Sequence, residues 1–170
     1  MAAVGFKEWA LVCDALGEGK QTVIIRKGGI AEGRDGFAFR HREFFLFPTF
    51  FHEQLNRVRL SRPTLPKQPS EEVEIRYFAR VEEARLLTRW NEVSALAPLH
   101  ILAESVVRER FEYSETPGVH VAFVQIFRLD PIWCFPDAKA YGGCRSWVSL
   151  PEPPSGLRLH PTAGGATWER

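Results

Sequence analysis

The chain has 170 residues, of which 45% are apolar and 25% charged, a balance typical of a folded globular domain and unlike that of a disordered chain. Lysine and arginine total 22 against 21 acidic residues, so the formal charge of +1 argues against a uniformly basic nucleic-acid-binding surface. Any electrostatic binding site must therefore be local.

The N-terminal part predicts one helix and one strand that ends at a pair of glycines. Apolar residues recur at three- and four-residue spacing over residues 6–16, which predicts a short amphipathic helix. The β-branched run 21–26 predicts a buried strand, and Gly28 and Gly29 follow it closely. An Asp-Gly pair at 35–36 predicts the turn of a hairpin.

The middle of the chain alternates extended and helical patterns. The aromatic run 37–48 is expected to form a strand or a buried loop, and residues 52–60 a short helix. Recurring prolines predict an extended loop over 61–70. Over residues 71–87 the apolar alternation changes phase near Phe78, which predicts a long strand with a β-bulge.

The C-terminal half predicts two short helices and two strands. Helical spacing over 91–111 is interrupted by a proline, which favours two helices or a kinked one. The alternation of 119–129 predicts a strand, and 144–150 a last one. We expect a single α+β domain over residues 1–150, followed by a flexible tail over 151–170 that is rich in proline and small residues.

These elements predict a curved, mostly antiparallel sheet or a small barrel with three or four short helices. By analogy at the level of the fold, the specific expectation is a PUA-like barrel, of the kind that binds RNA or modified DNA bases. The chain shows no signal-peptide pattern and no apolar run long enough to cross a membrane, and its three cysteines do not suggest a disulfide framework. A cytoplasmic protein is therefore expected.

The first candidate site is the group Arg26, Lys27, Gly28 and Gly29 at the end of a predicted strand. Glycines let backbone amides approach an anion while the two cations supply charge. Residues 1–70 carry 11 basic against 7 acidic side chains, so a basic face in this part is one interpretation. A tight turn among evenly solvated charges is the other.

A second candidate site combines Arg40, His41 and His52 with the neighbouring aromatic side chain of Phe47. Cations interleaved with aromatic rings are typical of surfaces that contact phosphates and stack on bases. The alternatives are ordinary core or surface histidines, or a small hydrolase that uses His41, His52 and Glu53. Neighbouring side chains of regular structure diverge, so His52 and Glu53 cannot both be assumed to face one site.

Near the C-terminus, Trp147 is a candidate for base stacking, and its alternative role is packing in the core. Cys144 and Ser146 lack the surroundings of a catalytic nucleophile. The sequence contains no HExxH or CxxC motif and no convincing nuclease motif, so neither a metal site nor a cofactor is predicted.

Several blocks together resemble a known family. They are KEWALVCDAL with QTVIIRKGGI, FFLFPTFFHEQ, RERF with VHVAFVQIFRL, and YGGCRSWVSL, and they span residues 6–150. This set is similar to domain of unknown function family 1802, whose members are sometimes joined to a restriction-endonuclease domain of the Mrr type. The family typically has a tyrosine where this chain has Phe50, and an extra residue precedes the histidine here.

The resemblance implies an association with DNA restriction or processing and identifies no catalytic residue. With the basic and aromatic residues above, it favours a nucleic-acid-binding or sensing module, with DNA or RNA and a nuclease as partners and no membrane partner. A small hydrolase or nuclease, and a scaffold that docks a partner protein, are the alternative hypotheses.

Overall fold

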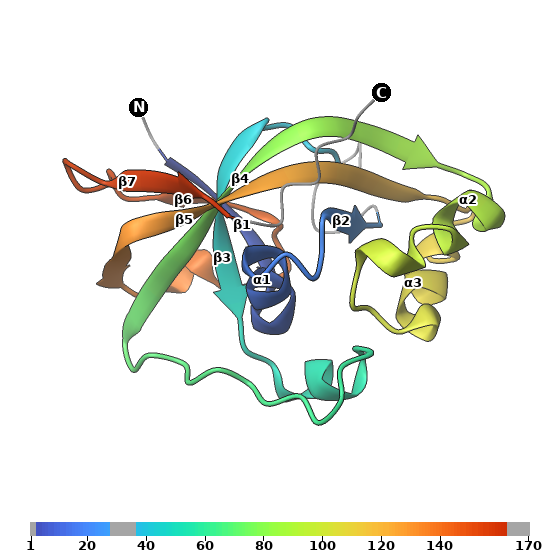
Figure 1. Cartoon of the computed structure of the whole chain (residues 1–170), viewed down its shortest axis with the longest axis horizontal. Helices are drawn as coiled ribbons and strands as arrows, with labels where there is room; N and C mark the ends of the chain where they lie inside the picture. The colour runs from blue at the N-terminus through green and yellow to red at the C-terminus, as the bar shows by residue number, and fades with distance from the viewer. Residues whose placement is uncertain (1–2, 28–36, 163–170) are drawn as a thin grey trace.

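One mixed sheet organises the computed structural model, which describes residues 3–27 and 37–162 (Figure 1). Its strands are β1 (Ala3–Trp9), β2 (Val23–Arg26), β3 (Glu43–Thr49), β4 (Glu72–Leu87), β5 (Val119–Pro136), β6 (Trp147–Leu150) and β7 (Arg158–Pro161). The helices are α1 (Ala10–Gly17), α2 (Trp90–Ser94) and α3 (Glu104–Phe111), with 3₁₀ turns η2 (His52–Asn56), η3 (Ala97–Leu99) and η4 (Lys139–Tyr141).

The strand order is β2-β5-β4-β3-β1-β6, with β7 added beside β5. Among the described strands only β1 and β3 are paired in parallel, and the order does not close into a barrel. The predicted fold class, an α+β protein with a curved and mostly antiparallel sheet, is therefore confirmed in its open form. None of the helices in the described residues is long and apolar enough to cross a membrane.

The long strands β4 and β5 pair with each other and are both bent (Figure 1). Their register shifts between Ile75 and Tyr77 and again between Val81 and Glu83. Such a shift marks a β-bulge or irregularity, and a bulge bends the strand and increases its local twist. The bulged strand expected from the change of apolar phase is confirmed.

The helix predicted over residues 6–16 is wrong in its first part, because residues 3–9 form β1 and the helix begins only at Ala10. β1 pairs with β3 along one edge and with β6 along the other, and it carries buried side chains on both faces. A strand that is buried on both faces shows no alternation of apolar and polar residues. Its apolar positions can therefore match a helical spacing by coincidence.

Other boundaries shift in smaller ways. The aromatic run divides into a loop over 37–42 and β3, and the expected helix at 52–60 is the shorter turn η2. The helices expected over 91–111 are present as α2 and α3, separated by η3. The expected tail contributes β7, which pairs with residues 127–130 of β5. The predicted hairpin turn at 35–36 lies outside the described residues.

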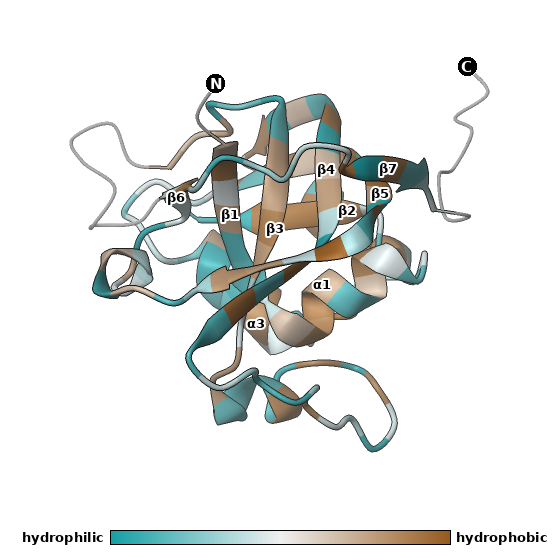
Figure 2. Ribbon diagram, turned by 90° about the vertical axis from the view of Figure 1, so that its left-hand side faces the viewer, coloured by the Kyte–Doolittle hydropathy of each residue, from teal (hydrophilic) through white to brown (hydrophobic). Residues whose placement is uncertain are grey.

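Two apolar cores lie against the sheet. The larger packs Phe6, Phe44 and Ile24 against the helices, and the smaller gathers Phe45 and Trp133. Figure 2 shows the hydrophobic stretches of β3 and β4 with α1 beside them. The packing leaves the end of β2, the end of β1 and the end of α3 close together, and the candidate site forms there.

A buried glutamine fastens η2 to the start of α1. Gln54 is 0% exposed, and its Oε1 accepts the Leu11 N–H at 3.1 Å. Its Nε2 donates to the carbonyls of Thr49 and Phe51, both at 2.9 Å. The bond to the Leu11 N–H is buried and the two bonds to carbonyls are partly buried, so this amide fixes the path of the chain after β3.

We expect Gln54→Leu to lower the free energy of unfolding by about 3 kcal/mol, because each buried backbone group left without a partner costs about 1–3 kcal/mol. Urea denaturation followed by circular dichroism would measure the loss. Gln68→Leu, at an exposed loop position, is the control and should stay within about 0.5 kcal/mol of the wild type. Equal stability of the two variants would contradict the role of the Gln54 amide.

A buried histidine makes the fold sensitive to acid. His100 is 6% exposed, and its Nδ1 accepts the Leu102 N–H at 3.0 Å, so that nitrogen carries no proton. Burial, and then the charges of Arg59 and Arg110, lower the pKa of His100 from 6.5 to about 4. As the pH falls from 6.5 to 4, the unfolded chain takes up a proton that the folded chain does not.

The free energy of unfolding should therefore fall through this pH window, by on the order of 3 kcal/mol from His100 alone. In His100→Asn the amide oxygen can replace the Nδ1 acceptor without titrating, so this variant should lose less stability between pH 6.5 and 4. Denaturation series at several pH values would measure the difference. His52→Asn, at an exposed histidine, should follow the wild type, whereas parallel curves for His100→Asn and the wild type would contradict the assignment.

Candidate functional site

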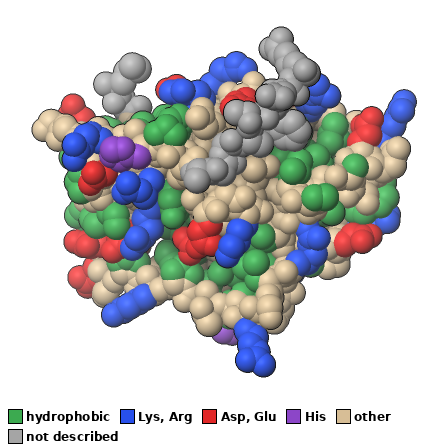
Figure 3. All heavy atoms as spheres, in the orientation of Figure 1, with side chains coloured by type: hydrophobic (Ala, Val, Ile, Leu, Met, Phe, Trp, Pro, Cys, Tyr) green, Lys and Arg blue, Asp and Glu red, His purple; other side chains and the backbone are tan. Residues whose placement is uncertain are grey.

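Six charged side chains from four parts of the fold influence one another beside the end of β2. They come from β1, β2 with the residue after it, the residue after η2, and α3, and we call them the charged cluster: Glu8, Arg26, Lys27, Arg57, Glu109 and Arg110. Four are cations and two are carboxylates, which leaves an excess of two positive charges. Elsewhere, Figure 3 shows basic and acidic side chains interspersed on the visible face.

Arg110 turns inward from α3 because residues two apart on a helix lie on different faces. Arg108 forms an exposed pair with Glu112 at 3.3 Å. Arg110 is partly buried, and its Nη1 donates to the Ile25 carbonyl at 2.7 Å. Its guanidinium lies 4.9 Å from the centre of the Trp9 ring. This arginine therefore joins α3 to both β2 and β1.

Arg26 joins the end of β2 to β1 in a similar way. Its Nη2 donates to the Lys7 carbonyl, and its guanidinium lies 4.7 Å from the centre of the Phe6 ring. Lys7 lies just past the residues of β1 that pair with β6. The Nε of Arg26 is buried and has no hydrogen-bond acceptor among the described residues.

The Arg110 guanidinium stays charged at neutral pH, although its surroundings disfavour the charge. Burial, followed by the charge of Arg26, lowers the pKa of the Arg110 guanidinium to about 10, and the charge of Glu8 opposes this shift. Glu8 is 2% exposed, and its Oε1 accepts the N–H of Trp9 at 2.8 Å. Its carboxylate offsets part of the positive charge but not all of it.

The outer part of the cluster is more open to solvent. Arg57 and Glu109 form an exposed pair at 3.7 Å. The Nζ of Lys27 lies 3.5 Å from the centre of the Tyr113 ring, a cation–π contact. Burial lowers the pKa of Lys27, and the charge of Glu109 opposes the change. The cluster therefore has a partly buried side, formed by Arg26 and Arg110, and a side that is open to solvent at Arg57.

Two more of the candidate residues from the sequence, His41 and Trp147, are connected to Arg26 through ring contacts. The Trp147 ring contacts Phe6 at 5.0 Å and His41 at 4.9 Å, and its Nε1 donates to the Ala38 carbonyl at 3.2 Å. The Arg26 guanidinium also lies over the Phe6 ring, so Arg26, Phe6, Trp147 and His41 follow one another in contact. Arg40, which is exposed, precedes His41 in the same loop. Gly28 and Gly29 lie outside the described residues.

Phe47 and His52 are placed elsewhere. Phe47 is 7% exposed in the smaller core, where its ring centre lies 5.4 Å from that of Tyr141. His52 and Glu53 are exposed on η2, whereas His41 packs against the first residue of β6. No group of three histidine, cysteine or acidic residues in the described chain is arranged to hold a metal ion.

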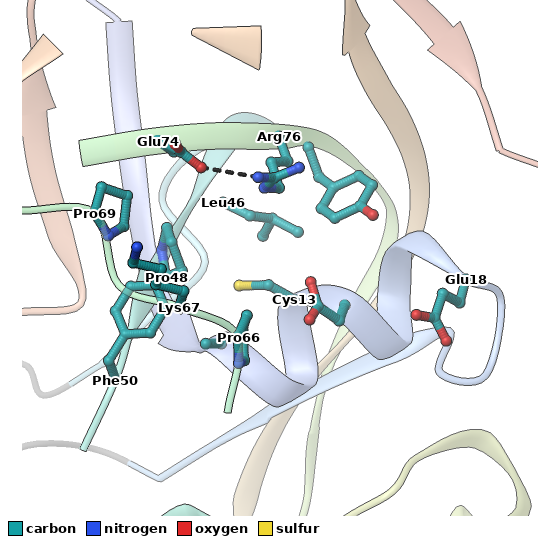
Figure 4. Close-up of a pocket in the computed structure, with 13 residues that line it drawn as sticks. Cys13, Glu18, Leu46, Pro48, Phe50, Pro66, Lys67, Pro69, Glu74 and Arg76 are labelled. Carbon is teal, nitrogen blue, oxygen red and sulfur yellow. Dashed lines mark hydrogen bonds and ion pairs between the residues drawn. The ribbon is translucent and has the colours of Figure 1, made fainter. Parts of the chain in front are cut away.

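A cavity of about 340 Å³ lies between α1, β3, β4 and the proline-rich loop (Figure 4). Cys13 points into it, and burial raises the pKa of its thiol well above the ordinary value, so the thiol remains protonated and is a poor nucleophile. Glu74 and Arg76 form an ion pair at 2.9 Å on the wall, and Lys67 lies on the loop side. The mixed charges give this cavity no excess of positive charge.

Sequence reasoning found Arg26 and Lys27 but missed the other four members of the cluster, which are Glu8, Arg57, Glu109 and Arg110. Glu8 had a usable signal, because an acidic residue between Phe6 and Trp9 marks a buried charge once that segment is a strand. Arg57 and Arg110 are separated from the others by long stretches of chain, and no local pattern reports such a contact.

The chain resembles crystal structures of the ASCH protein from Zymomonas mobilis, with a TM-score of 0.52, 16% identity and 88% of each chain covered. A point variant of that protein gives a TM-score of 0.53 at 15% identity, over 88% of this chain and 89% of the other. No curated protein sequence matches. The likeness shows that the two proteins share a fold.

A family model matches residues 5–170, which is nearly the whole chain. This protein therefore belongs to the family described as Domain of unknown function (DUF1802).

Proposed function

We propose that this protein binds nucleic acid and that the charged cluster contacts its phosphate backbone. The observation that carries the proposal is the excess of two positive charges, held by four segments beside aromatic rings. Arginine and lysine are the side chains that proteins use most for phosphate contacts. A phosphate would add the negative charge that the cluster lacks.

The arrangement of the two arginines supports an anionic ligand in particular. The positive charges of Arg26 and Arg110 repel each other, and the buried carboxylate of Glu8 offsets part of this repulsion. Partial burial strengthens the interaction of a guanidinium with an anion, because less water screens the charges. The Arg26 Nε is also a donor without a described acceptor.

The wider role is part of the same proposal. PUA-like barrels bind RNA or modified bases, and the resemblance to this family supports a link to DNA restriction or processing in the cytoplasm with a nuclease partner. In this proposal Arg26 and Lys27 contact phosphates, while Arg40 and His41 extend the contact along the neighbouring loop.

We expect the double variant Lys27→Gln/Arg57→Gln to bind oligonucleotides more weakly than the wild type. It should also lower the slope of log affinity against log salt concentration by about two, roughly one for each lost phosphate contact. Fluorescence anisotropy with single- and double-stranded DNA and RNA at several salt concentrations would measure both effects.

The matched control is Arg80→Gln/Arg85→Gln, which removes the same charge from two exposed ion pairs on β4. This control should keep the wild-type slope. If both double variants reduce the slope equally, net charge and not the charged cluster governs binding. Absence of binding by the folded wild type at low salt would overturn the proposal.

A further inference from the structure

A nucleic-acid site needs a place for bases as well as for phosphates, and of the two aromatic residues expected from the sequence one is buried and the other is partly exposed with rings packed around it. Phe47 is buried in the smaller core, and Trp147 is surrounded by Phe6, Phe44 and His41. Phe51 differs from both, because it is 39% exposed and adjoins the charged cluster.

Phe51 reaches the cluster through one intervening ring. Its ring centre lies 5.2 Å from that of Trp9 in an edge-to-face arrangement, and Trp9 in turn carries the Arg110 guanidinium. Phe51 also immediately precedes η2, and Arg57 immediately follows it. One short turn therefore presents an exposed ring at its start and a cation of the charged cluster at its end.

The backbone of Phe51 is held in place from below. Its carbonyl accepts a bond from the fully buried Gln54, which is itself tied to Thr49 and Leu11. The preceding ring, Phe50, is on the wall of the cavity shown in Figure 4. An exposed ring on a fixed backbone loses little conformational entropy when a ligand stacks on it.

We propose that Phe51 is a stacking platform for an unpaired base, so that the protein prefers single-stranded nucleic acid to duplex. The inference rests on the proposed function, since the charged cluster would hold the adjoining phosphate. Bases in a duplex are already stacked on their neighbours and offer no free face, whereas bases of a single strand stack readily on aromatic side chains. Stacking is sequence-tolerant, so no particular base is required.

The test variant is Phe51→Leu, which keeps apolar bulk against Trp9 but removes the aromatic face. We expect it to weaken binding of fluorescent oligothymidylate and oligouridylate roughly tenfold, with the salt slope unchanged because no cation is lost. Phe51→Trp should bind at least as well as the wild type. Ile132→Ala, at an exposed apolar residue of β5, is the control and should have no effect.

An oligonucleotide that lacks bases but keeps the phosphate backbone separates the two contributions. It should bind more weakly than oligothymidylate to the wild type, and Phe51→Leu should not weaken it further. The inference is overturned if the wild type binds duplex as tightly as single strands, or if Phe51→Leu binds oligothymidylate normally. Those results would leave the proposed function intact, whereas failure of the wild type to bind any probe would overturn both.

Discussion

Two arginine side chains of like charge are held close together, and the candidate site depends on how the fold tolerates this. Each guanidinium lies on an aromatic ring of β1 and donates to a backbone carbonyl. Arg26 uses Phe6 and the Lys7 carbonyl, and Arg110 uses Trp9 and the Ile25 carbonyl. Hydrogen bonds from a charged group are worth about 1.5–3 kcal/mol each, enough to offset repulsion that Glu8 already reduces.

The fold could be predicted where a local pattern was unambiguous. The alternation of β5, the phase change in β4 and the proline between α2 and α3 each reflect a cause within a few residues. β1 was misjudged because it carries buried side chains on both faces, packed in the two apolar cores by residues from distant parts of the chain. Burial on both faces is a tertiary property, and it removes the alternation on which the prediction depends.

The candidate site could be predicted only in part, for a similar reason. The two cations that follow a predicted strand indicated Arg26 and Lys27, whereas Arg110 reaches the site from a helix distant in the sequence. Phe51 is exposed at the point where the buried Gln54 binds its carbonyl. The motif FFLFPTFFHEQ contains this glutamine, whereas the candidate chosen by residue type was His52, two positions earlier.

The open sheet has a mechanical consequence. Between β2 and the end of β1 the described structure is joined by the side chains of Arg26 and Arg110, not by a ladder of backbone hydrogen bonds. Separating two strands of a ladder breaks many bonds cooperatively, but a single side chain can exchange one acceptor for another while every ladder stays intact. A ligand that takes over the hydrogen bonds of either guanidinium would therefore loosen this seam without breaking a strand pairing.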